Sequence, residues 1–294
     1  EEAHWPWKID ANLNTVGCEN FDGALTCSMT AHPKICPVTG ELLAFSYFSF
    51  EQPYLKYIRV GADGKLKQIE GIELPEMVMM HDFNITESYV IFMDLPLALD
   101  LNLLASGIPF RFKRENQARL GVMPRNGSAD DIRWFEIDPC YVFHQVNAWE
   151  QGDVITLFVS KQNSAFGADS GDFSEVSRLH RWQINLATGQ VTEDKVDDRP
   201  GDFGRVNDNF VGQQSQFGYL MALDGEGNRE EPSYGPKLYQ YDLLSGHCNE
   251  HFLGKGTRGA EPVYAAVPSS KAENDGWVMC LVHNEHNNKS KLVI

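Results

Sequence analysis

Short runs of β-branched and aromatic residues recur along the chain, and turn residues separate many of them. The runs that predict strands are residues 41–50, 89–94, 132–137, 154–160, 179–185, 217–223, 237–243, 276–283 and 289–294. Hairpin turns are favoured at Thr39-Gly40, Asp63-Gly64, Thr188-Gly189, Gly225-Glu226-Gly227 and Ser245-Gly246, because glycine reaches positive φ without strain. Hairpins that recur without helices between them predict an all-β protein, either a propeller or another large antiparallel fold.

One stretch departs from this pattern. Residues 96–121 are first apolar, with several leucines, and then basic. The stretch predicts an excursion from the sheets, a loop with a helical turn. It would either pack on the core between neighbouring sheets or cover an apolar tunnel, and the residues alone leave both alternatives open.

Charge and cysteine content narrow the class of protein. The net charge of −16 over 294 residues comes from acidic residues that are spread along the chain. Nucleic acid is therefore not an expected partner, because phosphate binding needs stripes of Lys and Arg. Six cysteines without a Cys-x-x-Cys pair indicate neither a disulfide scaffold nor a zinc site.

The two ends of the sequence suggest a part of a longer protein. The chain begins at Glu1-Glu2-Ala3-His4 without an initiator methionine, and it stops at Lys291-Leu292-Val293-Ile294 within an apolar strand. No targeting segment or long apolar run is present. We expect a cytoplasmic protein on this basis.

Three histidines have polar and aromatic neighbours in sequence, as metal ligands often do. His32, His81 and His144 lie in strand-like segments, 49 and 63 residues apart. A local metal motif cannot have this spacing, whereas a radial fold brings one side chain from each repeat to a central axis. Taken singly, such histidines are more often structural than metal ligands: His32 precedes a proline, as structural or exposed histidines do, His81 ends an apolar run, as core histidines do, and His144 lies in an aromatic strand. The residues alone therefore leave a three-histidine metal site as one alternative.

The histidine segments resemble the carotenoid cleavage oxygenase family, which includes the lignostilbene dioxygenases. The resemblance runs in order along nearly the whole chain. It rests on Pro6-Trp7-Lys8-Ile9-Asp10, Ala31-His32-Pro33-Lys34, Thr39-Gly40-Glu41, Met79-Met80-His81-Asp82-Phe83, Asp94-Leu95-Pro96, Asp130-Asp131-Ile132-Arg133-Trp134-Phe135, Phe143-His144, Asp197-Asp198-Arg199-Pro200 and Glu261-Pro262-Val263-Tyr264. The lignostilbene-like branch is the most similar, on residues 79–83 and 130–135.

The resemblance implies a seven-bladed β-propeller, of which residues 1–294 form a partial propeller domain. In the family, four histidines on the axis hold Fe(II), and three of them match His32, His81 and His144. The fourth is expected beyond Ile294. Carboxylates stand behind three of the family's histidines. By alignment order, Glu2 lies behind His81, Asp202 behind His144, and Glu261 behind the fourth histidine. The family usually has Glu where this chain has Asp202, so a longer or water-bridged contact is expected there.

The implied activity is Fe(II)-dependent cleavage of an alkene C=C by O₂ to give two carbonyl products. The implied partners are O₂ and an apolar carotenoid, apocarotenoid or stilbene, and the complete protein could also contact a membrane peripherally to take up substrate. The lignostilbene branch has a lysine just before the first acid, where this chain has Glu1, and an acid there disfavours a phenolate. The alternatives are a non-cleaving, isomerase-type relative and a propeller scaffold without iron. Residues 1–294 alone are expected to be poorly stable and inactive.

Overall fold

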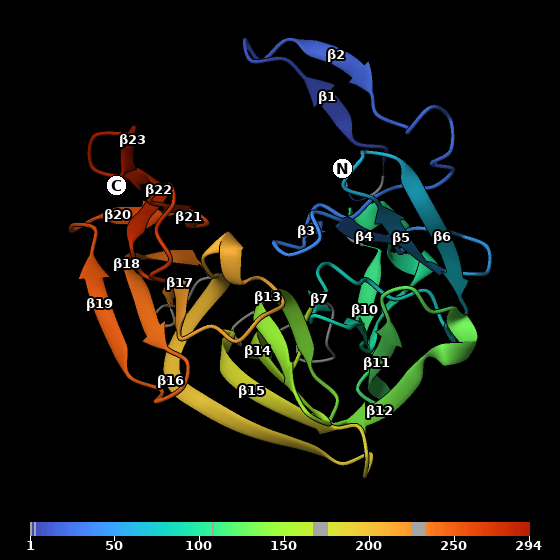
Figure 1. Cartoon of the computed structure of the whole chain (residues 1–294). Helices are drawn as coiled ribbons and strands as arrows, with labels where there is room; N and C mark the ends of the chain where they lie inside the picture. The colour runs from blue at the N-terminus through green and yellow to red at the C-terminus, as the bar shows by residue number, and fades with distance from the viewer. Residues whose placement is uncertain (1, 3, 108, 167–175, 225–232) are drawn as a thin grey trace.

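The computed structural model describes residue 2 and residues 4–107, 109–166, 176–224 and 233–294. Antiparallel sheets dominate it, and they lie like blades around a common centre (Figure 1). The first two blades have four strands each. Blade 1 consists of β3 (Lys34–Ile35), β4 (Leu42–Ser46), β5 (Leu55–Val60) and β6 (Leu66–Ile72). Blade 2 consists of β7 (Asn84–Ile85), β8 (Tyr89–Asp94), β11 (Ala118–Pro124) and β12 (Arg133–Ile137).

Blades 3 and 4 share one long strand and so form a single seven-stranded sheet. Blade 3 consists of β13 (Tyr141–Gln151), β14 (Val154–Gln162), β15 (Arg178–Asn185) and the first part of β16 (Val191–Arg205). Blade 4 consists of the last part of β16 with β17 (Phe217–Asp224), β18 (Ser233–Asp242) and β19 (Cys248–Phe252). Up to Pro200, β16 pairs with β15, and from Gly201 it pairs with β17. It is therefore the outer strand of one blade and the inner strand of the next.

Blade 5 has an interrupted inner edge. It consists of β20 (Thr257–Gly259) and β21 (Val263–Ala266), which both pair with β22 (Gly276–Asn284), and of β23 (Lys289–Val293) on the other side of β22. A separate hairpin of β1 (Trp7–Ile9) and β2 (Thr15–Cys18) projects beside blade 1 (Figure 1). The described residues thus form five blades in an open arc.

The core lies between the faces of neighbouring blades. Every residue of β14 except its two ends is buried, because a central strand of a blade is covered on both faces. The largest buried cluster joins blades 1, 2 and 3 and includes Phe45, Phe92 and Trp182. A second cluster, which includes Phe158 and Tyr241, joins blades 3 and 4. Side chains that stand perpendicular to each sheet therefore hold the arc together.

The structure confirms the all-β class and has a strand within each predicted run, although β4 ends at Ser46, four residues before the predicted end of its run. Gly40, Gly64, Gly189 and Gly246 have positive φ in connections between paired strands. The turn expected at residues 225–227 lies outside the described residues. The predicted strand starting at residue 237 begins earlier, at Ser233.

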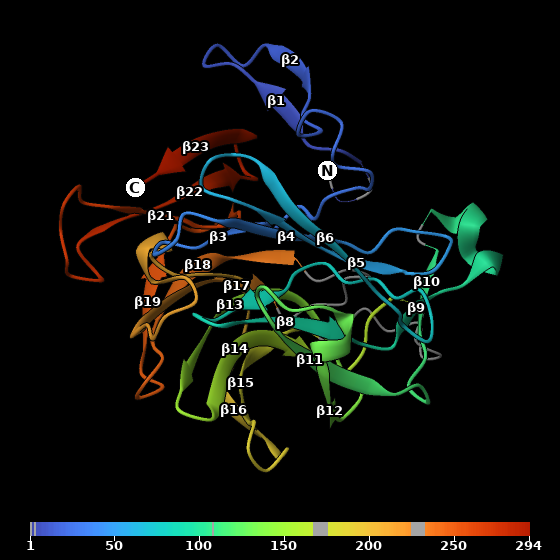
Figure 2. The ribbon, with the colours of Figure 1, turned by 45° about the vertical axis from the view of Figure 1, so that its right-hand side comes forward.

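The predicted excursion is shorter than expected, because β11 already begins at Ala118. It contains a small hairpin, β9 (Leu97–Leu99) with β10 (Phe110–Phe112), around the 3₁₀ helix η1 (Leu101–Ser106), and Figure 2 shows it projecting from one side. Both phenylalanines of β10 are buried, whereas Leu101 and Leu104 are exposed. The excursion is thus anchored on the core by its strands.

The remaining helices are short. They are η2 (Ala129–Asp131) and η3 (Asp208–Phe210), each a 3₁₀ turn of three residues. Among the described residues, no helix has the length and apolar character needed to cross a membrane.

Candidate metal centre

Three histidines from three blades meet at the centre of the arc. His32 stands two residues before β3, His81 stands three residues before β7, and His144 lies within β13. The potential ligand atoms of the three imidazoles all lie within 4.8 Å of one another. Nε2 of His32 is 3.0 Å from Nε2 of His81, and each pair of rings is steeply inclined, at 65° to 86°. Three nitrogen donors therefore converge on one point.

The expectation that all three histidines lie in strands was wrong for His32 and His81, which lie in irregular backbone. The geometry of a blade explains this. Side chains of a strand stand perpendicular to its sheet and so point toward the neighbouring blade. A side chain that must point inward, within the plane of the sheet, needs a break in the pleat.

The other site residues follow the same rule. The register of β13 shifts on both sides of Gln145, next to His144. The register of β16 shifts between Asp202 and Arg205. Glu261 lies in the interruption between β20 and β21. Bulges often redirect side chains beside active sites, and here an irregularity occurs at each inner strand that contributes a candidate residue.

Gly204 lets two of these irregular segments approach each other. A Cβ atom at this position would lie 2.6 Å from the backbone oxygen of Gln145 and 2.6 Å from Cγ2 of Val146. These contacts are too short, and one of the neighbours is backbone that cannot move aside cheaply. Glycine is therefore required where the bulge of β16 contacts the bulge of β13.

We expect Gly204→Ala to lower the free energy of unfolding by about 1–3 kcal/mol, because overpacking forces the backbone to shift. The shift would also move Asp202 relative to His144 and weaken metal retention. Thermal unfolding and metal content measure the two effects. Gly201→Ala is the matched control in the same strand, since its added Cβ meets its nearest neighbour at an ordinary 3.4 Å. Equal behaviour of the two variants would contradict this account.

Glu2 accepts a hydrogen bond from His81. Its Oε1 lies 2.8 Å from Nδ1 of His81, and the hydroxyl of Tyr47 donates to the same oxygen at 2.6 Å. Burial alone would raise the pKa of Glu2, but these hydrogen bonds and the charge of His81 outweigh it and lower that pKa. Glu2 therefore stays ionised near neutral pH. Glu2 lies in irregular backbone with φ of 62°. Glu1 lies outside the described residues.

Asp202 lies beside His144 in less favourable geometry. Its Oδ1 is 3.1 Å from Nδ1 of His144, yet this nitrogen makes no well-aligned hydrogen bond to any residue that the structure describes. The same oxygen accepts the backbone N–H of Phe203 at 2.8 Å. Burial would lower the pKa of His144, but the Asp202 carboxylate outweighs it and raises that pKa. The short aspartate thus reaches the histidine directly, although its alignment is poor.

Glu261 pairs with an arginine rather than with a histidine. Its Oε1 lies 2.5 Å from Nη2 of Arg205. Within the described ranges, no fourth histidine joins the cluster. His283 hydrogen-bonds with Ser290 across the β22–β23 hairpin. The histidine expected in front of Glu261 is therefore not among the described residues.

His32 has no carboxylate partner among the residues that the structure describes. Burial is the largest influence on it and lowers its pKa to about 4. The imidazole is therefore neutral near pH 7, which is the form that binds a metal. Imidazole nitrogens with carboxylates behind two of the rings suit a divalent first-row metal such as Fe(II), because a carboxylate fixes the tautomer and raises the basicity of the ligand. The donor set thus fits iron.

Aromatic rings line the centre. The ring of Phe143 is 5.9 Å from that of His81, and the ring of Phe203 is 4.4 Å from that of His144. Tyr141 and Phe166 extend this group beyond Phe143, at 4.7 Å and 5.4 Å. The sequence did not distinguish these rings among its 17 phenylalanines. Sequence position could have singled out two of them, because Phe143 directly precedes His144 and Phe203 directly follows Asp202.

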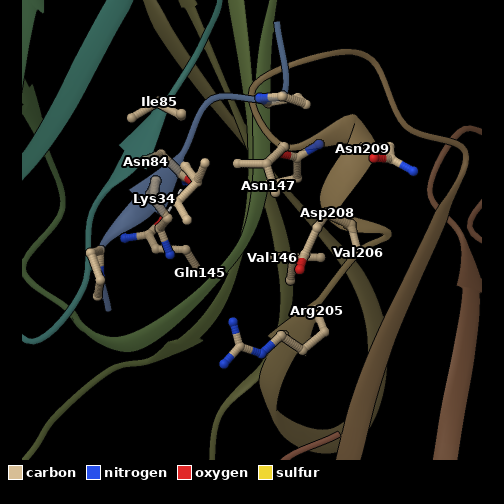
Figure 3. A pocket seen from close by; sticks show the side chains of 15 residues that line it. Lys34, Asn84, Ile85, Gln145, Val146, Asn147, Arg205, Val206, Asp208 and Asn209 are labelled. Atoms are coloured by element: carbon tan, nitrogen blue, oxygen red, sulfur yellow. Dashed lines mark hydrogen bonds between the residues drawn. The ribbon is translucent and has the colours of Figure 1, made fainter. Parts of the chain in front are cut away.

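A cavity of about 350 Å³ with both polar and apolar lining residues begins one to three residues beyond the histidines along the inner strands. Its lining includes Lys34, Asn84, Asn147 and Arg205. Figure 3 shows Lys34 and Asn84 on one side and Asp208 and Asn209 on the other. None of the three histidines lines this cavity, so it adjoins the cluster without containing it.

Comparisons with known proteins agree along the whole chain. A family model described as "RPE65: Retinal pigment epithelial membrane protein" matches residues 1–294. The carotenoid 9,10(9',10')-cleavage dioxygenase 1 of Phaseolus vulgaris is 33% identical over 98% of this chain. The crystal structure of Pseudomonas brassicacearum lignostilbene dioxygenase superposes over 100% of this chain with a TM-score of 0.89 and 30% identity.

Cobalt-substituted ACO of Synechocystis also superposes over the whole chain, with a TM-score of 0.84 and 25% identity. The chain spans 57% of the length of the Phaseolus relative, 66% of the Pseudomonas chain and 65% of the Synechocystis chain. The family model, the sequence identity and the arc of blades agree. This chain belongs to the carotenoid cleavage oxygenase family, which the retinal pigment epithelial membrane protein model describes.

Proposed function

We propose that the complete protein is an Fe(II)-dependent dioxygenase. It would cleave a C=C bond of a carotenoid, apocarotenoid or stilbene-type substrate to give two carbonyl products. The observation that carries this proposal is the convergence of His32, His81 and His144 from three blades to within 4.8 Å. The relatives support it, because they are named as a carotenoid cleavage dioxygenase and a lignostilbene dioxygenase.

The protein's own groups would hold the metal and tune its ligands. Fe(II) bound there would supply the activation of O₂. The three histidines would offer nitrogen donors, and Glu2 would accept a hydrogen bond from Nδ1–H of His81, which directs the Nε2 lone pair of that ring inward. Imidazole ligands bring no negative charge to the metal, so the carboxylates of Glu2 and Asp202 would offset the charge of the cation from behind the ligands. No protein acid or base is required.

The aromatic rings at the centre would position the substrate. Phe143 and Phe203 contact the imidazoles, and such apolar faces suit an extended conjugated alkene while excluding water. The resemblance leaves carotenoid and stilbene substrates open, although Glu1 in place of a lysine disfavours a phenolate. O₂ would be the second substrate.

Three further proposals complete this function. A fourth imidazole would join the cluster in front of Glu261. The complete protein would make peripheral contact with a membrane when it takes up an apolar substrate. Residues 1–294 produced alone would not turn substrate over, because three imidazoles from separate blades would hold the metal loosely.

Metal removal tests the proposed function. The complete protein should contain iron as purified and should lose cleavage activity after treatment with a chelator. Fe(II) should restore the activity, whereas Zn(II), which has no redox chemistry, should not. Assays with a stilbene and with an apocarotenoid identify the substrate class, and two carbonyl products indicate cleavage. A single isomerised product would favour a non-cleaving relative, and a folded protein that binds no iron would favour a scaffold.

A further inference from the structure

A buried ion pair joins two of the histidine-bearing segments. Nζ of Lys34, two residues after His32, lies 2.7 Å from Oδ1 of Asp82, the residue after His81. The two side chains are only 15% and 3% exposed. The pair therefore connects blade 1 to blade 2 directly beside the histidines.

The same carboxylate also holds the third histidine segment. Oδ2 of Asp82 accepts the backbone N–H of Gln145, the residue after His144, at 3.0 Å. The register of β13 shifts on both sides of Gln145, so this N–H lies in an irregular part of the ladder. Asp82 is thus bonded to residues near all three histidines.

A hydroxyl group ties the His32 segment from its other side. Oγ1 of Thr30 accepts the backbone N–H of His32 at 3.1 Å and donates to the backbone oxygen of His81 at 3.3 Å. Thr30 stands two residues before His32, and Lys34 stands two residues after it. His32 is therefore held toward His81 at two points, one on each side.

In the described part of the chain, His32 lacks the carboxylate partner that His81 and His144 have, and these contacts hold it in place instead. Oxygens of Glu2 and Asp202 lie beside the Nδ1 atoms of His81 and His144, whereas no described carboxylate bonds to the ring of His32. We propose that the Lys34–Asp82 ion pair, together with Thr30, positions His32 for metal binding. The inference rests on the proposed function, because it assigns Lys34, Asp82 and Thr30 as positioning residues for that metal.

The energetics of buried ion pairs agree with this role. Desolvation of two charges largely cancels their attraction, so a buried pair is weak evidence of stabilisation. Its better-attested use is to fix a register between packed segments. Here the three segments carry the histidines, and the carboxylate satisfies hydrogen-bond donors from all of them.

Lys34→Met tests the inference in the complete protein, with Co²⁺ as the probe. Methionine keeps the length of the side chain and removes its charge. We expect Co²⁺ affinity to fall about 10–100-fold, the usual effect of losing an outer partner of a ligand. The visible spectrum of bound Co²⁺ should also change, because the direction of His32 would change. Lys34→Arg, which keeps the charge, should restore most of both properties.

Arg119→Met is the matched control. Arg119 and Asp94 form an ion pair of the same length, 2.7 Å, with 16% and 8% exposure, between β11 and β8. This variant should change the midpoint of thermal unfolding but leave Co²⁺ affinity and its spectrum as in the wild type. If Lys34→Met does not fold, Thr30→Val serves as the second variant, because it removes both Thr30 hydrogen bonds at nearly constant volume.

The outcomes separate this inference from the proposed function. Wild-type protein that binds no Co²⁺ contradicts the metal site itself. The positioning role is overturned if the wild type binds Co²⁺ and Lys34→Met binds it equally tightly with an unchanged spectrum. If only Thr30→Val folds, the same result in that variant overturns it. Weaker binding with an altered spectrum in the folded variant, and an unchanged control, supports it.

Discussion

His81→Ala is expected to release the metal from the complete protein and to abolish alkene cleavage. His81 contacts both other histidines of the cluster, with Nε2 3.0 Å from that of His32 and its ring 4.9 Å from that of His144. Its loss removes one of the three converging nitrogens and leaves the Glu2 carboxylate without its histidine. We expect a loss of metal affinity greater than the roughly 10–100-fold caused by losing an outer partner. Iron analysis and a cleavage assay measure the result.

His283→Ala is the control for this experiment. His283 is also a histidine near a strand end, but its ring bonds to Ser290 in the β22–β23 hairpin. The His283→Ala variant should keep wild-type iron content and turnover. Full iron content and normal turnover in His81→Ala would remove His81 from the site.

Glu2→Gln is expected to reduce iron affinity or turnover by about 10–100-fold without unfolding the protein. The amide oxygen of glutamine can still accept hydrogen bonds from His81 and Tyr47, which both donate to Oε1 in the wild type. The variant therefore removes charge while it keeps the geometry. Its effect reports how far an anion behind His81 strengthens that ligand. Metal titration together with steady-state kinetics measures it.

Glu41→Gln provides a matched control for Glu2→Gln. The side chains of Glu41 and Glu2 are similarly buried, at 21% and 25% exposed, and Glu41 pairs with Arg59. Loss of this ion pair should leave the metal unaffected. If Glu2→Gln has wild-type iron affinity and kinetics, Glu2 is a bystander.

The strands of this fold could be predicted where they are long enough to show a pattern. Residues 89–94 form β8 with the predicted bounds, because an apolar run between polar residues fits a strand buried on both faces. The inner strands β3 and β7 have two residues each, and two residues carry no period. In the first two blades the residue runs therefore identified β4, β8 and β12. They missed the two-residue inner strands, and they also missed β11, which begins within the predicted excursion, while β5 and β6 were indicated only by the turn at Asp63-Gly64.

The site could be predicted only in part for a related reason. Spacing indicated that three histidines could converge on an axis, and the family resemblance supplied the acids behind them. Local pattern could not show that the backbone at His32 and His81 leaves the strand, because that depends on the position of the axis. Lys34 and Asp82 stood within the recognised segments without a role. Their pairing crosses two blades, and the only local signal was a charged residue, Asp82, inside an apolar stretch.

The continuous course of β16 has a consequence for folding. Its 15 residues would span roughly 50 Å when extended, and they pass from one blade to the next without a loop. Blades joined by loops can open one at a time, as local units of differing stability. Blades 3 and 4 instead share one continuous strand, so the opening of either blade disturbs a strand that also belongs to the other. Their amide protons should therefore exchange with solvent in a single cooperative opening, and Asp202 lies inside that unit.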